Sequence, residues 1–133
     1  MKAGEGEVGD YGGPNRIGEV GDGLDNHHVP SKAAVIESME RDLGRELNPT
    51  ERANAINEST SVTVDKSVHL EQPTTGGRNT ADLVGKDASD LRSAANRDCD
   101  ALAKSWSQRG VPASQIQSTI NEIHNMNQRL GRY

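Results

Sequence analysis

Cysteine is almost absent from this chain, and its scarcity excludes two kinds of architecture. Cys99 is the single cysteine, so neither an intramolecular disulfide framework nor a cysteine-rich zinc site can hold the fold together. Its position near the apolar face of a predicted helix indicates a small buried side chain. No basic partner stands at a spacing that would make it a nucleophile.

Long apolar runs are also missing. No stretch approaches the roughly 20 apolar residues that a membrane-spanning helix needs, and the N-terminus lacks the apolar core of a secretory signal. We therefore expect a soluble protein, which would need another route if it leaves the cell.

Positive charge is in deficit. Fifteen lysines and arginines face 20 aspartates and glutamates, which gives a formal net charge of −5 at pH 7. This balance argues against a broadly basic surface for nucleic acid, because contacts to phosphate require positive charge. A metal ion with a few clustered arginines can still create a local positive site on an acidic protein.

Large aromatic side chains are few, with no phenylalanine, one tryptophan and two tyrosines. The core must therefore be built from leucine, isoleucine, valine, alanine and methionine. A length of 133 residues suits one domain with a modest core. We expect a glycine-rich lead-in over residues 1–23, either a linker or a loop wrapped over the domain, and a single domain over residues 24–133.

Hydrophobic periodicity predicts an α+β domain that is mostly helical. Stretches with period-3.6 spacing and capping signals run from Ser31 to about Gly44 or Glu46, from Asn48 to about Asn57, from Thr80 to Gly110, and onward from Val111-Pro112. The last two helices should pack as an antiparallel hairpin. Alternation over Ser61–Leu70 predicts the one convincing strand, which carries His69.

The stretch with the strongest chemical character is Asp25-Asn26-His27-His28, which holds two of the four histidines. Successive side chains of an extended segment point to opposite faces, so the two imidazoles should take different roles. One can bind a metal while the other accepts a proton from water. Asp25 would share a face with His27, as a ligand or as an acceptor that orients it.

His69 is the candidate to complete a metal shell, and such a site would suit hydrolysis of a phosphodiester bond. The competing interpretation is that His27 and His28 are solvated loop residues and that His69 has a packing role. His124 lies one position off the isoleucine stripe of the last helix, which favours a polar-face or packing role. Trp106 is interpreted as a core or hinge residue.

Two segments, Asp25–Ala33 and Val68–Asn79, together resemble the HNH/endonuclease VII superfamily. In particular they resemble nuclease toxin domains found at the C-termini of bacterial polymorphic toxins and secretion-system effectors. Those domains often carry a His-His-x-Pro stretch and, further on, a histidine followed by a loop with threonine and glycine. The resemblance implies a ββα unit with a short β-hairpin that binds one divalent metal ion, such as Mg, Mn, Zn or Ni.

Carried onto this chain, the resemblance implies metal ligation by His27 and His69, with Asp25 as an additional ligand. His28 would be the general base, and Asn79 or Asn57 would orient it. Arg78 would contact phosphate, since a guanidinium matches phosphate geometry.

The sequence departs from the superfamily pattern in two ways. Two predicted helices stand where the minimal motif has a short hairpin, and no helix bearing the last ligand is evident. The C-terminal helical hairpin has no counterpart, and could serve substrate grip or binding of a cognate immunity protein.

The leading hypothesis is a metal-dependent endonuclease acting on DNA. It would be made in a bacterial cytoplasm and delivered by a secretion system into a target cell as the toxic part of a larger protein. Two alternatives remain open: a toxin hydrolase that acts on RNA, and a non-catalytic acidic helical adaptor or inhibitor, which explains the net charge more directly.

Overall fold

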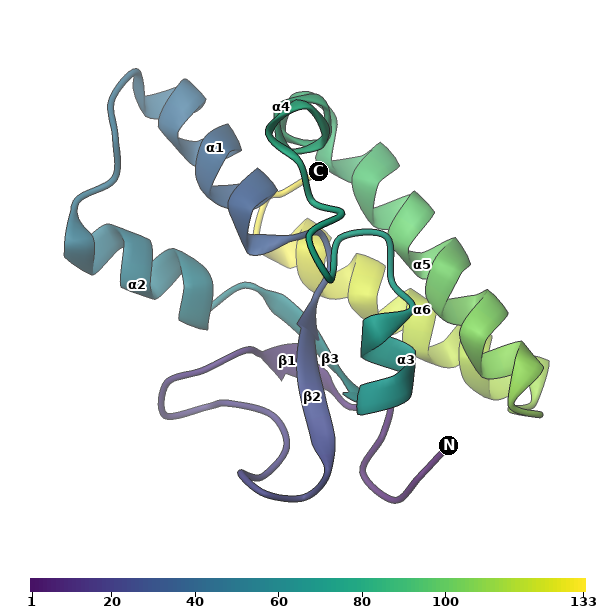
Figure 1. Cartoon of the computed structure of the whole chain (residues 1–133). Coiled ribbons are helices and arrows are strands. Elements are labelled where there is room, and N and C mark those ends of the chain that lie inside the picture. The colour runs from purple at the N-terminus through teal and green to yellow at the C-terminus, as the bar shows by residue number, and fades with distance from the viewer.

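A three-stranded antiparallel sheet lies at the centre of the molecule, with helices packed around it (Figure 1). The computed structural model describes residues 1–133. The elements in chain order are β1 (Val8–Asp10), β2 (Leu24–His28), α1 (Lys32–Leu43), α2 (Pro49–Asn57), β3 (Thr60–Asp65), α3 (Lys66–Leu70), α4 (Ala81–Ser89), α5 (Leu91–Gln108) and α6 (Ala113–Arg129). The predicted α+β class, with helices predominating, is confirmed.

β3 is the middle strand of the sheet. Val62 pairs with Val8 of β1 on one side and with His27 of β2 on the other. Its first five residues are all buried, which suits a strand that is covered on both faces. β2 and β3 form the expected antiparallel pair, but α1 and α2 connect them instead of a tight turn.

The predicted strand over Ser61–Leu70 is wrong in its second half. β3 ends at Asp65, whose side chain accepts a hydrogen bond from the Ser67 N–H at 3.1 Å and caps the short helix α3. Val68 is buried there, whereas Leu70 is 64% exposed. The alternation of Val68 and Leu70 therefore resembles that of a strand, but the cap at Asp65 starts a helix there instead.

The single helix predicted from Thr80 to Gly110 is also wrong, because the chain breaks at Asp90. This residue has φ −154° and ψ 83°, outside the helical region, and it accepts from the Ser93 N–H at 3.0 Å as the N-cap of α5. Apolar residues keep their helical spacing across Asp90, so the sequence pattern alone does not indicate the break. The result is two helices, with α4 turned to pack against α1.

A buried charge cluster fixes α4 on α5. Arg97 makes two hydrogen bonds of 2.8 Å to the carboxylate of Asp87, and its Nη2 also donates to Asp98 at 3.0 Å. The second carboxyl oxygen of Asp98 is buried without a partner. Burial raises the pKa of Asp98 to about 6, against the opposing effect of Arg97.

The core lies between the sheet and the α5–α6 hairpin. Figure 1 shows α5 and α6 side by side, and α6 lies against β1 and β3. Leu102, Trp106 and Ile123 are fully buried there, which confirms the predicted hairpin and a core role for Trp106. Cys99 is also buried, and burial raises the pKa of its thiol to about 12. No helix of the chain has both the length and the apolarity to span a membrane.

The far end of α6 is bonded to the residue that follows β2 and to the first residue of β3. Asn127, which is buried, donates to the carbonyl of Val29 at 3.0 Å and accepts from the Thr60 hydroxyl at 2.8 Å. The hydroxyl of Tyr133 lies 2.7 Å from Nδ1 of His124 and accepts from Asn127 at 3.0 Å. His124 therefore serves packing at the end of the chain.

The segment expected to be a lead-in supplies the edge strand β1. Its side chains also reach the body of the domain: the Glu5 carboxylate accepts from the Trp106 indole N–H at 2.9 Å and from the Asp65 N–H at 3.0 Å. Ile17 is buried, and its side chain lies so close to Gly9 that a Cβ there would be 2.6 Å from it. Its glycine-rich composition concealed the strand, because the pairing partner lies in a distant part of the chain.

Replacing Ile17 with alanine should therefore destabilise the protein. We expect Ile17→Ala to lower the free energy of unfolding by about 2–4 kcal/mol, because it removes a buried side chain from a fixed site. Val20→Ala is the matched control, since Val20 is 87% exposed and its change should stay within about 0.5 kcal/mol. Urea denaturation measures the free energy of unfolding of both variants. Equal losses would mean that residues 1–23 are only loosely attached to the domain.

The buried Asp98 predicts a specific pH dependence of stability. A folded-state pKa of about 6 lies above the unfolded value of about 3.9, so the contribution of this group is present below pH 4 and is lost as the pH rises through 6. The difference corresponds to roughly 3 kcal/mol. Asp98→Asn should therefore gain stability relative to the wild type between pH 4 and pH 7.

Thermal unfolding at several pH values tests this expectation. Asp100→Asn, at an exposed position of the same helix, is the control and should follow the wild-type profile. A constant difference between Asp98→Asn and the wild type across this range would contradict it.

Candidate functional site

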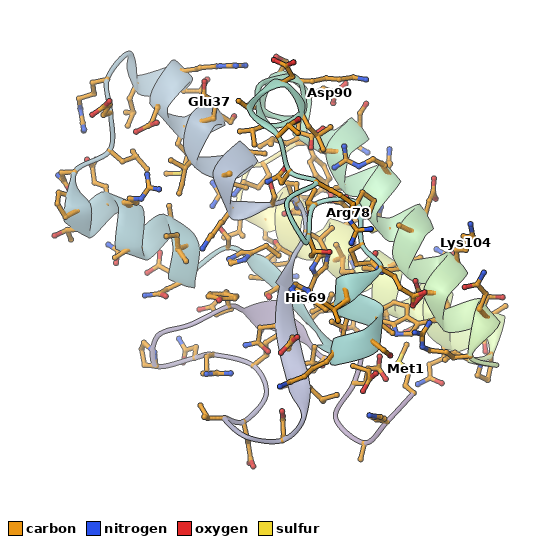
Figure 2. The ribbon with its side chains drawn as sticks, in the orientation of Figure 1. Met1, Glu37, His69, Arg78, Asp90 and Lys104 are labelled. Atoms are coloured by element: carbon orange, nitrogen blue, oxygen red, sulfur yellow. The ribbon has the colours of Figure 1, made fainter.

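The two adjacent histidines end β2 beside a pocket of about 320 Å³. The pocket lies among β2, α3, the start of α1 and the loop that follows α3 (Figure 2, near the His69 label). His27, His28 and His69 all line it. The structure therefore brings together the three histidines that the sequence singled out and leaves His124 elsewhere.

His27 and His69 face each other directly. Their Nδ1 atoms lie 3.0 Å apart, and the rings meet edge to face with centroids 5.0 Å apart. His27 is only 2% exposed, and its Nε2 is buried without a partner. Burial, followed by the charges of His69 and His28, lowers the pKa of His27 to about 3. This imidazole is therefore neutral near pH 7, which is the form that binds metals.

The 3.0 Å spacing of the pair is that of a hydrogen bond, and it is also compatible with two ligands to one ion. Ligand nitrogens at about 2.0–2.1 Å from a metal are separated by about 2.9–3.4 Å at octahedral or tetrahedral angles, which includes the observed spacing. No group of three histidine, cysteine, aspartate or glutamate side chains converges in the chain. Asp25 lines a neighbouring pocket that His69 also lines. The residues present thus fit a metal as a two-nitrogen set, and ligation by Asp25 stays a prediction.

His28 has different partners from His27, as alternation along β2 requires. Its Nε2 lies 3.1 Å from the carbonyl oxygen of Ile56, so this nitrogen carries the proton and donates it. Its ring stacks on Tyr11, with centroids 4.0 Å apart and planes at 27°. Nδ1 is therefore the ring atom that can accept a proton. Burial, with a smaller effect of the Lys32 charge, lowers the pKa of His28 to about 4 and keeps this acceptor free near neutral pH.

The order of β2, β3 and α3 supplies the helix that the sequence did not reveal. β2 carries the histidine pair, β3 lies beside it, and α3 follows β3 directly and carries His69. Assigning Ser61–Leu70 to one strand had removed this helix from the prediction. The connection through α1 and α2 leaves the ββα succession in place, because both helices lie outside the β2–β3 pairing.

The expected phosphate contact, Arg78, has its guanidinium engaged within its own loop. Nε donates to the carbonyl of Thr75 at 2.8 Å, and Nη2 donates to the Thr75 hydroxyl at 3.0 Å and to the carbonyl of Leu70. Arg78 therefore holds the loop after α3 in shape, and contact with a phosphate stays a prediction.

The two candidate asparagines lie in different places. Asn79 lines the pocket and reaches the Ser31 hydroxyl at 3.4 Å, while its Oδ1 is buried without a partner. Asn57 accepts from the Gly12 N–H through its carbonyl at 3.1 Å and is not among the pocket residues. Of the two, only Asn79 is at the pocket.

Tyr11 and Lys32 are among the pocket residues that were not predicted as site residues. Lys32 follows the histidine segment directly, so its place at the start of the expected helix could have indicated it. Tyr11 reaches His28 only through the fold of the N-terminal segment, which Asn26 fixes by donating to the carbonyls of Tyr11 and Ile17 at 3.1 and 3.0 Å. No local pattern marks that contact.

Comparison with known proteins gives one informative similarity. No family model matches the chain, and no solved structure matches it. Deoxyribonuclease CdiA from Dickeya dadantii (strain 3937) is 39% identical over 125 residues, which are 94% of this chain and 4% of that protein. The chain thus spans a small fraction of the length of its relative. Since only a few residues of the 133 lie outside the match, it must span His27, His28 and His69.

Proposed function

We propose that this chain is a nuclease domain that hydrolyses phosphodiester bonds in DNA with the help of a divalent metal ion. The observation that carries the proposal is the convergence of His27, His28 and His69 at one pocket, where the Nδ1 atoms of His27 and His69 lie 3.0 Å apart and Nε2 of His28 contacts the Ile56 carbonyl. The 39% identity to a protein named as a deoxyribonuclease supports DNA as the substrate.

The ββα succession of β2, β3 and α3 supports membership of the HNH/endonuclease VII superfamily. In this proposal His27 and His69 hold the ion, and Asp25 is a further candidate ligand. Two imidazole nitrogens favour Zn, Ni or Mn over Mg, which prefers oxygen ligands. When bound, the ion supplies Lewis acidity toward the phosphoryl and leaving oxygens.

His28 provides the proton acceptor for the attacking water. The Ile56 carbonyl fixes the tautomer with the proton on Nε2, so that Nδ1 takes the proton of water as its oxygen attacks phosphorus. The bond from phosphorus to the leaving ester oxygen breaks in the same displacement. The stack on Tyr11 keeps the imidazole from rotating out of this position.

We further propose that the domain is the toxic part of a larger antibacterial protein, which a secretion system delivers into target cells. The support is the similarity to a small fraction of a much longer deoxyribonuclease. Such an arrangement requires a cognate immunity protein in the producing cell, because the domain would otherwise attack the DNA of that cell.

Cleavage of plasmid DNA tests the chemistry. Purified protein with Mg, Mn, Ni or Zn should cut the plasmid, and His28→Ala should reduce the rate by at least about 10²-fold, since general bases contribute about 10²–10⁴-fold. His124→Ala is the matched control and should retain activity. Equal rates for His28→Ala and the wild type would refute the role of His28, and a parallel assay with RNA tests the alternative substrate.

Metal binding gives a second, independent measurement. Isothermal titration with Zn, Ni or Mn should show one site in the wild type and at least roughly tenfold weaker binding in His27→Ala and in His69→Ala. His124→Ala should bind as the wild type does. Unchanged affinity in both site variants would mean that the His27–His69 contact is a hydrogen bond with a packing role.

A further inference from the structure

The pocket beside the histidines is free of negative charge. The protein as a whole carries a net charge of −5, yet no aspartate or glutamate is among the residues that line this pocket. Besides the three histidines and Tyr11, its one ionisable side chain is that of Lys32. A concave site with this composition favours an anion, because the protein elsewhere would repel one.

The N-terminal turn of α1 adds hydrogen-bond donors at the same place. Ser31 caps this 12-residue helix by accepting from the Ala34 N–H at 3.2 Å, and its carbonyl accepts from the Val35 N–H at 3.1 Å. The N–H groups of Lys32 and Ala33 precede the helical ladder and have no acceptor within it. Ser31, Lys32 and Ala33 all line the pocket, so the positive end of the helix dipole lies at its wall.

One buried polar atom at this pocket lacks a partner, which points to a missing ligand independently of the helix. His27 is 2% exposed, and its Nε2 has no hydrogen-bond partner. Buried polar atoms are normally satisfied, so an unpaired atom beside a pocket indicates a group that binds there.

Lys32 is also better placed than Arg78 to contact an anion here. Arg78 uses Nε and Nη2 on the carbonyls and hydroxyl of its own loop. Lys32 is exposed at the mouth of the pocket, and none of the hydrogen bonds or ion pairs of the protein involves its ammonium group. Lysine binds phosphate as a compact charge on a flexible stem, which suits a contact at the edge of a site.

We infer that Lys32 and the first-turn amides of α1 form a phosphate subsite, which holds one phosphodiester group of the nucleic acid beside His28. The identity of the anion rests on the proposed function, whereas the anion site itself rests on the composition of the pocket. Lys32 is thus a substrate-binding residue. It places a phosphate next to the His28 ring, which accepts the proton, although the protein as a whole is acidic.

Thymidine 3′,5′-bisphosphate is a suitable probe, because it carries the phosphate chemistry without a cleavable internucleotide bond. Its titration into ¹⁵N-labelled protein, with a chelator present, should shift the backbone amides of Lys32 and Ala33 and the side-chain amide of Asn79. Shifts confined to other regions, or none at all, would overturn the inference.

Substitutions separate charge from structure. Lys32→Gln should weaken bisphosphate binding by roughly tenfold or more, and Lys32→Arg should retain most of it. Lys104→Gln is the control, since Lys104 is exposed on α5, well away from His69 in Figure 2. For a single-stranded oligonucleotide, Lys32→Gln should also reduce the slope of log affinity against log salt by about 0.7, the effect of one phosphate contact. Equal affinity and slope for Lys32→Gln and Lys104→Gln would overturn the inference.

Failure of this inference and failure of the proposed function give different results. If the bisphosphate binds at Lys32 but the protein cleaves no nucleic acid with any metal, the subsite stands and the nuclease proposal fails. If His28-dependent cleavage is found and Lys32→Gln binds the bisphosphate as the wild type does, the nuclease proposal stands and the subsite fails.

Discussion

The pairing of β2 with β3 determines where the two adjacent histidines lie. In the observed register His27 stands opposite Val62 and His28 opposite Ser61. A shift by one residue would exchange the two histidines between faces, because side chains alternate along a strand. The pairing is held firmly, since β3 is buried along most of its length and β1 occupies its other edge. The different environments of His27 and His28 therefore follow from the register of the sheet.

The surroundings of each histidine then set its chemistry. His27 has lost almost all contact with solvent and faces a second imidazole, which keeps it neutral and directs one nitrogen toward a shared position. His28 retains a partly open environment, and one backbone carbonyl fixes its tautomer. Lys32 acts on both substrate and base, because the charge that attracts a phosphate also lowers the pKa of His28. These effects combine within one small pocket of an acidic protein.

The sequence predicted those features whose signals are local. The helices at 32–43 and 49–57 were expected because Ser31 and the Asn48–Glu51 capping box mark their starts. The histidine pair and its distant partner were found because histidines are rare in this chain. Local signals failed where a cap overrode periodicity, as at Asp65 and Asp90, and where a contact joined remote segments. β1 and the Tyr11–His28 stack depend on the whole sheet being assembled, so no window of sequence contains them.

The bonds from Asn127 to Val29, just after β2, and to Thr60 of β3 have a consequence for the order in which the fold can form. A ribosome releases the chain from its N-terminus, so Asn127 is synthesised 98 residues after Val29 and 67 residues after Thr60, the two residues that it joins. Glu5 likewise waits for Trp106, 101 residues later, before its carboxylate has its indole partner. β2, which carries the histidine pair, and β3 thus emerge long before α6, which joins them. The bonds that hold the segment after β2 against α6 can therefore form only once α6 has been synthesised.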